Sequence, residues 1–278
     1  MKLSVKDIKE LKNKRKITML TAYDYPTASL LDKAGIDIIL VGDSLANVVL
    51  GLDSTTSIGM PEMLHHSKAV TRAVKNSLVL GDMPYASYQL NTDEALLNAR
   101  RFIEEASCSG VKLEWFDNCP KATKKITAQG IPVMGHIGLT PQTADKTGGF
   151  KVRGKEATSA KILIDQALAL EDSGCFAIVL ECVPDKLSEI ITKKLKIPTI
   201  GIGAGLHCDG QVLVINDMLG LFERYTPKFV KRYASLSDII LKAVKEYKED
   251  ILKERFPQKE HSFLIKEEEL KKIYEEEG

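Results

Sequence analysis

The strongest constraint on the fold is the alternation of short apolar runs, rich in β-branched residues, with longer amphipathic segments. Such runs are typical of parallel strands that are buried on both faces and connected by helices. Eight strands of this kind predict a closed (β/α)8 barrel of the α/β class. The runs cover residues 17–24, 36–44, 78–84, 110–114, 131–138, 175–183, 197–205 and 211–217.

The segments between the runs predict helices, and residues 92–107 show the pattern best. Thr92 can cap the N-terminus, and Asp93 and Glu94 suit its positive end. Further helices are predicted at 61–75, 120–129, 159–173, 185–195 and 236–255. The connector between the last two runs looks too short for a full helix.

An open doubly wound sheet is the alternative fold, because it shares the βαβ repeat and the strand count does not exclude it. The length of 278 residues fits one barrel domain, for which about 250 residues is typical. We expect an N-terminal helix within 1–16, the barrel over 17–256 and a charged tail over 257–278. The tail forms a helical extension that packs on a neighbouring subunit or faces solvent.

Charge and cysteine content narrow the class of partner and the compartment. Lys and Arg number 39 against 38 Asp and Glu, so no basic field is available for nucleic acid or an anionic membrane. No apolar run approaches the roughly 20 residues of a membrane span. The five cysteines form no C-x-x-C pair, and their odd number argues against a complete disulfide framework. We expect a cytoplasmic enzyme with small-molecule substrates.

Polar residues close several of the apolar runs. In barrels the active site lies at the carboxyl ends of the strands, so these positions are the first candidates for function. A carboxylate buried there needs a cation, a hydrogen-bond donor or a raised pKa. The candidates are Asp43, Ser44, Asp82, Lys112, Glu114, His136 and Glu181.

Three of these carboxylates, Asp43, Asp82 and Glu114, close consecutive runs and are predicted to converge at one rim of the barrel. Ligation by oxygen alone selects a hard cation such as Mg2+, whereas zinc favours His and Cys spacings that this sequence lacks. The alternative for each residue is that it caps the following helix or pairs with a lysine.

The other candidates each leave more than one role open. Lys112 binds a substrate carboxylate, forms a Schiff base or neutralises the acidic cluster. His136 donates to a developing oxyanion or is a satisfied core histidine. Glu181 serves as a general base or forms a salt bridge. The long segment 139–158, which contains Gly148, Gly149 and Gly154, is predicted to be an active-site lid.

The strand-end phrases occur in an order and spacing similar to those of one known family. The sequence resembles ketopantoate hydroxymethyltransferases from about residue 3 to residue 263. The phrases that carry the resemblance are TAYDYP, VGDSL, GDMP, VKLE, GHIGLTPQ, GGFKV, LECVP, IPTIGIGAG and DGQVLVINDMLG.

The resemblance implies a barrel of the phosphoenolpyruvate/pyruvate type that moves a hydroxymethyl group from 5,10-methylenetetrahydrofolate to 3-methyl-2-oxobutanoate and gives 2-dehydropantoate. Asp43, Asp82 and Glu114 match the family's magnesium ligands. Ser44 and Lys112 match its 2-oxo acid contacts, Asp43, Asp82 and His136 are expected to contribute to substrate binding as well, and Glu181 matches its proton acceptor. The family also implies a homo-oligomer, commonly a decamer.

Three positions depart from the family pattern. After VKLE we expect a glycine pair, but this chain has Trp115 and Phe116, and Ala46 stands where a glycine is common. The aromatic pair puts substrate preference in more doubt than reaction class. Two other functions stay open at this point: a folate-independent, metal-dependent aldolase or lyase acting on a 2-oxo acid, and a catalytically silent barrel that binds one.

Overall fold

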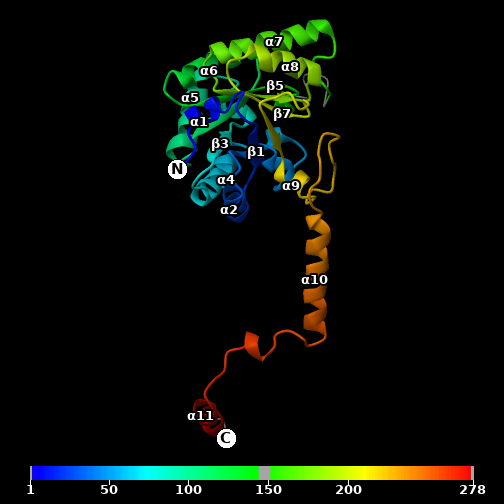
Figure 1. The fold of residues 1–278 in the computed structure, drawn as a ribbon. Helices are drawn as coiled ribbons and strands as arrows, with labels where there is room; N and C mark the ends of the chain where they lie inside the picture. The colour runs from blue at the N-terminus through cyan, green and yellow to red at the C-terminus, as the bar shows by residue number, and fades with distance from the viewer. Residues whose placement is uncertain (1, 144–150, 277–278) are drawn as a thin grey trace.

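Eight parallel strands close into a barrel in the computed structural model, which describes residues 2–143 and 151–276 (Figure 1). Each strand pairs with its neighbours in sequence, and β8 pairs with β1. The closed barrel is therefore confirmed, and the open-sheet alternative is wrong. The strands are β1 (Ile17–Thr21), β2 (Ile38–Val41), β3 (Leu78–Asp82), β4 (Gly110–Glu114), β5 (Val133–Gly138), β6 (Ala177–Glu181), β7 (Thr199–Ile202) and β8 (Gly210–Leu213).

The core has two layers, as the alternation of side chains along a strand requires. Residues such as Met19, Leu80 and Val179 point inward and fill the barrel. Their sequence neighbours, such as Val79 and Leu180, point outward and pack beneath the surrounding helices. Strands β2, β3 and β4 are buried along their whole length, which explains why they read as continuous apolar runs.

Helices connect most of the strands and cover the outside of the barrel. The helices are α1 (Val5–Glu10), α2 (Tyr25–Lys33), α3 (Leu45–Val48), α4 (Met60–Ala73), α5 (Thr92–Glu104), α6 (Cys119–Thr127), α7 (Ala157–Asp172), α8 (Asp185–Lys194), α9 (Ile215–Met218), α10 (Leu236–Leu252) and α11 (Glu267–Glu276), with the 3-10 turns η1 (Thr55–Ser57), η2 (Tyr85–Ser87) and η4 (Lys259–His261). The six helices predicted between and after the apolar runs are present, with ends shifted by a few residues, and α1 and α11 confirm the predicted N-terminal helix and helical extension.

Two local features differ from the sequence-based expectation. The cap of α5 is Asn91 and not Thr92, because the Asn91 side chain accepts a hydrogen bond from the backbone N–H of Asp93. Helix α2 was not predicted, although Asp24 caps it and Pro26 occupies its first turn. The caps Asn91 and Asp24 and the first-turn Pro26 are signals of one or two residues, so a search for apolar stripes does not detect them.

The barrel lacks a helical cover next to β8. The connector from β7 to β8 holds no helix, as predicted, and only the four-residue α9 follows β8 directly. Helix α10 runs away from the barrel, α11 lies farther out still, and neither helix has a buried residue (Figure 1). The outer faces of β1 and β8 consequently leave Thr18 and Gln211 exposed, whereas β2 to β7 carry no exposed residue.

The domain boundaries stay a prediction, although the strands of the barrel end at Leu213, well before residue 256. Of the predicted lid, residues 144–150, with Gly148 and Gly149, lie outside the described residues. Within the described part of the chain, no helix combines the length and the apolar character needed to cross a membrane.

Candidate active site

All seven candidate side chains lie at the carboxyl ends of neighbouring strands. Strand register explains the arrangement, because Asp82 of β3 stands beside Lys112 of β4, and Glu114 stands beside His136 of β5. Lys112 and Glu114 are two residues apart, so they share the inner face of β4. The next pairing brings Glu181, the last residue of β6, opposite Gly138. The register therefore brings Asp82, Lys112, Glu114, His136 and Glu181 to one end of the barrel, and their roles stay a prediction.

Lys112 and Asp82 form a buried ion pair at the centre of the site. The Nζ atom of Lys112 lies 2.7 Å from both carboxylate oxygens of Asp82, and both side chains are almost fully buried. The backbone N–H of Asp43 also donates to Asp82, at 3.2 Å. Burial raises the pKa of Asp82 to about 7, with Lys112 opposing that rise and Asp43 adding to it.

The carboxylates around Lys112 favour its charged form. Burial on its own would lower the pKa of Lys112, but Asp82, Asp43 and Glu114 raise it above its ordinary value. A lysine held as an ammonium ion has no free electron pair, so this geometry disfavours the Schiff base and favours binding of an anion or neutralisation of the cluster.

Glu114 has one carboxylate oxygen engaged and one that accepts no hydrogen bond. Its Oε2 accepts the backbone N–H of Gln142 at 3.0 Å, whereas Oε1 is buried without a hydrogen-bond partner. Oε1 lies 3.5 Å from Nδ1 of His136. Burial and the charge of Asp43 raise the pKa of Glu114 well above its ordinary value.

His136 lies between two carboxylates. Its Nδ1 faces Glu114, and its Nε2 lies 3.2 Å from Oε2 of Glu181. Burial lowers the pKa of His136, Lys112 lowers it further, and the contact with Glu181 opposes the change. Both ring nitrogens of His136 are buried and neither makes a hydrogen bond, so each faces a carboxylate as an unpaired polar atom.

Three residues next to the site were not predicted as site residues. The hydroxyl of Tyr23 lies 2.8 Å from that of Ser44. Gln142 contacts both Asp43 and Glu114, and Tyr88 hydrogen-bonds to Gln142. Tyr23 and Gln142 stand in the phrases TAYDYP and GHIGLTPQ, so the family phrases held a signal for them. Tyr88 stands in none of those phrases.

The charge balance of the site fits a cation. Asp43, Asp82 and Glu114 are buried at the same end of the barrel with Lys112 as their counter-charge, and a buried excess of negative charge is costly. The unpartnered Oε1 of Glu114 is the kind of hard oxygen that Mg2+ prefers. Among the described residues, however, no three His, Cys, Asp or Glu side chains already meet as a metal cluster. Asp82 faces Lys112 instead, and Glu114 faces Gln142.

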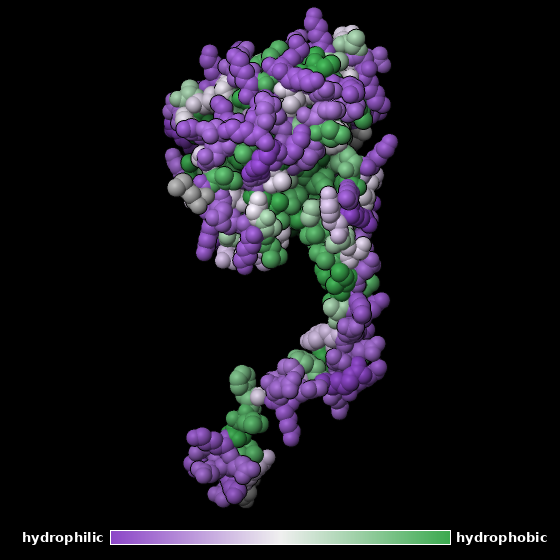
Figure 2. Space-filling view, viewed as in Figure 1, coloured by the Kyte–Doolittle hydropathy of each residue, from purple (hydrophilic) through white to green (hydrophobic). Residues whose placement is uncertain are grey.

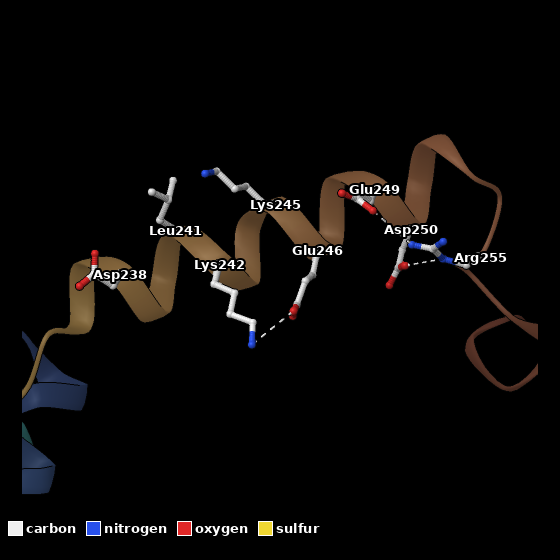
Figure 3. Close-up of a pocket in the computed structure, with 8 residues that line it drawn as sticks. All are labelled: Asp238, Leu241, Lys242, Lys245, Glu246, Glu249, Asp250 and Arg255. Atoms are coloured by element: carbon white, nitrogen blue, oxygen red, sulfur yellow. Dashed lines mark hydrogen bonds and ion pairs between the residues drawn. The ribbon is translucent and has the colours of Figure 1, made fainter.

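The hollow drawn in Figure 3 lies elsewhere. It is lined by charged side chains and Leu241 along α10, together with Arg255, which follows that helix. Ion pairs such as Lys242 with Glu246 cross it. No residue of the acidic rim lines this groove, so we assign the chemistry to the carboxyl ends of the strands.

A closed parallel barrel whose strand ends carry a buried lysine, a histidine and four carboxylates is the framework of a (β/α)8-barrel enzyme. The sequence profile of the ketopantoate hydroxymethyltransferase family matches residues 2–259. The chain belongs to this family, which confirms the resemblance.

Two relatives match along almost their whole length, and both are 3-methyl-2-oxobutanoate hydroxymethyltransferases. The protein of Syntrophomonas wolfei is 56% identical over 263 residues, covering 95% of each chain. That of Carboxydothermus hydrogenoformans is 51% identical over 274 residues, covering 98% of this chain and 99% of its own.

Solved structures with far lower identity share the fold. Phosphoenolpyruvate phosphomutase from Streptomyces platensis gives a TM-score of 0.59 at 15% identity, covering 91% of this chain and 88% of its own. A phosphonopyruvate hydrolase in complex with oxalate and Mg2+ gives 0.59 at 13% identity, covering 99% of this chain and 96% of its own. These likenesses support the barrel and nothing finer.

Proposed function

We propose that this protein transfers a hydroxymethyl group from 5,10-methylenetetrahydrofolate to 3-methyl-2-oxobutanoate and forms 2-dehydropantoate in pantothenate biosynthesis. The observation that carries the proposal is the 56% identity, over 95% of the chain, to the 3-methyl-2-oxobutanoate hydroxymethyltransferase of Syntrophomonas wolfei. The buried group of Asp82, Lys112, Glu114 and His136 supports it, because the site holds both acidic ligands and a fixed cation.

The residues proposed to hold Mg2+ are Asp43, Asp82 and Glu114. They supply only oxygen, they carry excess negative charge, and one oxygen of Glu114 lacks a partner. Bound Mg2+ would polarise the keto and carboxylate oxygens of the 2-oxo acid and make the hydrogen on its C3 more acidic.

The chain's own side chains then have separate roles. Ser44 and Lys112 bind the 2-oxo acid, with the ammonium ion of Lys112 balancing charge that develops on its oxygens. Glu181 accepts the proton from C3 of the 2-oxo acid. Water adds to the methylene carbon of the folate, both carbon–nitrogen bonds to that carbon break, and tetrahydrofolate leaves. C3 then bonds to the released one-carbon unit, whose oxygen comes from the water, and Glu181 returns its proton to that oxygen. His136 lies 3.2 Å from Glu181, so it can orient that carboxylate or donate to a substrate oxygen.

The test is the formation of 2-dehydropantoate from 3-methyl-2-oxobutanoate with and without methylenetetrahydrofolate. We expect turnover only with the folate, complete loss after EDTA treatment and recovery with Mg2+. Equal turnover with and without methylenetetrahydrofolate would favour the folate-independent aldolase or lyase. Binding of the 2-oxo acid with no turnover under any condition would favour the silent barrel. Borohydride trapping should give no adduct on Lys112.

We also propose a homo-oligomer, which the family implies to be a decamer, in which α10 covers a second copy of the barrel. One face of α10 carries Ile240, Val244, Tyr247 and Ile251 at helical spacing, and all four are exposed. The charged groove of Figure 3 follows the opposite face. Figure 2 shows apolar residues gathered along the upper part of α10 and where the chain leaves the barrel.

The barrel offers a matching surface. The outer faces of β1 and β8 are the uncovered ones, with Thr18 and Gln211 exposed. A hollow lined by Leu206, Gln211 and Phe229 lies on the same side. The outer face of β1 and β8 lacks a packed helix, and the apolar face of α10 lacks a packed surface. If α10 of one chain packs on β1 and β8 of an identical chain, both surfaces become buried.

Two substitutions on neighbouring positions of α10 test this docking. Val244→Asp places a carboxylate on the apolar face, and Lys245→Asp places the same group on the charged face. We expect Val244→Asp to reduce the mass measured by light scattering after size exclusion, while Lys245→Asp keeps the mass of the wild type. Equal masses for all three proteins would contradict the assignment of this face.

The proposed compartment is the cytoplasm. All five cysteines are free, and Cys108, Cys119, Cys175 and Cys208 are buried. Free thiols persist where glutathione and thioredoxin keep them reduced.

A further inference from the structure

Gln142 touches two of the three proposed metal ligands, although neither the strand pattern nor the family's ligand set assigns it a role. It follows β5 in a short turn at residues 141–143 and is buried. We propose that Gln142, oriented by Tyr88, is the positioning residue that holds Asp43 and Glu114 ready for a divalent cation. This inference rests on the proposed function of those carboxylates.

The orientation of the Gln142 amide is fixed by its partners. Its nitrogen lies 3.1 Å from the backbone carbonyl of Met83, which can only accept, so this side of the amide is the NH2 group. The same nitrogen donates to Oδ2 of Asp43 at 3.0 Å. The amide oxygen accepts the hydroxyl of Tyr88 at 2.5 Å. All three contacts agree on one orientation.

The backbone of Gln142 holds the second carboxylate. Its N–H donates to Oε2 of Glu114 at 3.0 Å, and the hydroxyl of Tyr88 accepts the backbone N–H of Glu114 at 3.3 Å. Gln142 therefore ties the end of β2 to the end of β4. Tyr88 completes a closed set of hydrogen bonds between the two residues.

A neutral donor has a different effect from Lys112. The ammonium ion of Lys112 neutralises the carboxylate that it binds, whereas the amide of Gln142 fixes a carboxylate and leaves its charge in place. Because Oε2 of Glu114 is engaged, Oε1 is the oxygen presented without a hydrogen-bond partner. Groups that orient metal ligands in this way contribute to affinity without touching the metal.

Phe116 packs against the ring of Tyr88. The two rings meet edge to face, with centroids 5.4 Å apart and planes at 71°. The family pattern predicts a glycine in this part of the chain, so Phe116 is a feature of this sequence that braces the Tyr88 ring.

The test measures binding of Mn2+, as a paramagnetic stand-in for Mg2+, by electron paramagnetic resonance on the full-length protein without substrate. We expect Gln142→Leu to weaken binding about 10- to 100-fold, the range for lost outer-shell partners. Tyr88→Phe removes only the hydroxyl and should weaken binding about 5- to 10-fold, as one lost hydrogen bond does. Gln129→Leu and Tyr25→Phe, both on the surface, are the matched controls and should bind as the wild type does.

The double variant separates positioning from general destabilisation. Because Tyr88 acts through Gln142, adding Tyr88→Phe to Gln142→Leu should weaken Mn2+ binding no further. Should Gln142→Leu fail to fold by circular dichroism, Gln142→Met takes its place. Wild-type affinity in both single variants, or fully additive losses in the double variant, would overturn this inference alone. Absence of Mn2+ binding by the wild type would overturn the metal site as well.

Discussion

Asp32 and Asp82 are both buried aspartates near opposite ends of β3, and their environments differ completely. Asp32 lies below the strand and accepts five hydrogen bonds, from the backbone N–H groups of Lys75, Asn76 and Ser77 and from the side chains of Asn76 and Ser77. Burial would raise its pKa, but these donors lower the pKa of Asp32 to about 2. At the other end, burial raises the pKa of Asp82 to about 7.

The difference between Asp32 and Asp82 indicates that the amino end of the barrel contributes to stability and the carboxyl end to function. At the amino end of the barrel Asp32 has five donors, and Asp37 and Asp209 are paired with Arg15 and Lys12. At the carboxyl end Asp82 is paired with Lys112, but one oxygen of Glu114 is buried without a donor, which costs stability unless a ligand or proton arrives. Substitutions at the two ends should therefore affect different measurements.

The largest expected effect is on turnover at the carboxyl end. Glu181→Gln removes the proposed proton acceptor and should lower kcat by about 10²- to 10⁴-fold. Because Glu181 is not a proposed metal ligand, the affinity for Mn2+ and the melting temperature should stay near those of the wild type. Glu189→Gln, on the surface of α8, is the control and should keep its turnover. A kcat within threefold of the wild type would remove Glu181 from the mechanism.

Sequence patterns located the carboxyl end well because its polar residues interrupt apolar runs. A carboxylate such as Asp82, at the end of a run of Leu, Val and Gly, can be recognised as a candidate site residue from its position alone. The fold followed from the same runs, since eight strands with helices between them have few arrangements. Neither inference needs knowledge of which side chains touch.

The remaining features depend on contacts between distant parts of the chain. Gln142 meets Asp43 across 99 positions and Tyr88 across 54, and no local pattern predicts such pairings. The direction of α10 was not predictable either. Its apolar stripe indicated a buried face but not whether that face would be covered by its own barrel or by another copy.

A stability effect is expected at the amino end. Asp32→Ala leaves the buried N–H group of Ser77 and those of Lys75 and Asn76 without their acceptor, and should reduce the free energy of unfolding by about 2 to 4 kcal/mol. Chemical denaturation measures this loss, and kcat of the folded fraction should not change. Asp24→Ala, which removes the exposed cap of the same helix, is the comparison and should cost only about 1 kcal/mol. A fall in kcat with unchanged stability would reverse the assignment of this end.

The pH dependence of stability should differ in sign between the two aspartates. Asp82 has a folded pKa above its ordinary value of 3.8, so the folded protein holds a proton that the unfolded chain releases. For metal-free protein in EDTA, this part of the stability is present below about pH 4 and lost as the pH rises to about 7, by about 1 to 3 kcal/mol. Asp82→Asn should flatten that slope in denaturation curves recorded between pH 4 and 7.

Asp32 acts in the opposite direction and in a lower range. Its folded pKa of about 2 lies below the ordinary value, so its contribution is present above about pH 4 and lost as the pH falls toward 2. Asp32→Asn should therefore flatten acid unfolding and leave the slope between pH 4 and 7 unchanged. Matching slopes for Asp32→Asn and Asp82→Asn in both ranges would show that the two ends do not differ as described.

The smallest expected effect comes from Phe116, which is not a proposed metal ligand and whose ring packs against Tyr88. Phe116→Leu keeps an apolar side chain but removes the edge-to-face contact with Tyr88, which is worth about 0.5 to 1.5 kcal/mol. Only part of that energy acts on the orientation of Tyr88, so Mn2+ affinity should fall by about two- to fourfold. Combined with Tyr88→Phe, which keeps the ring but lacks the hydroxyl, Phe116→Leu should have no further effect on Mn2+ binding. A residual effect in that combination would mean that Phe116 acts on the carboxyl end by another route, such as the backbone of β4.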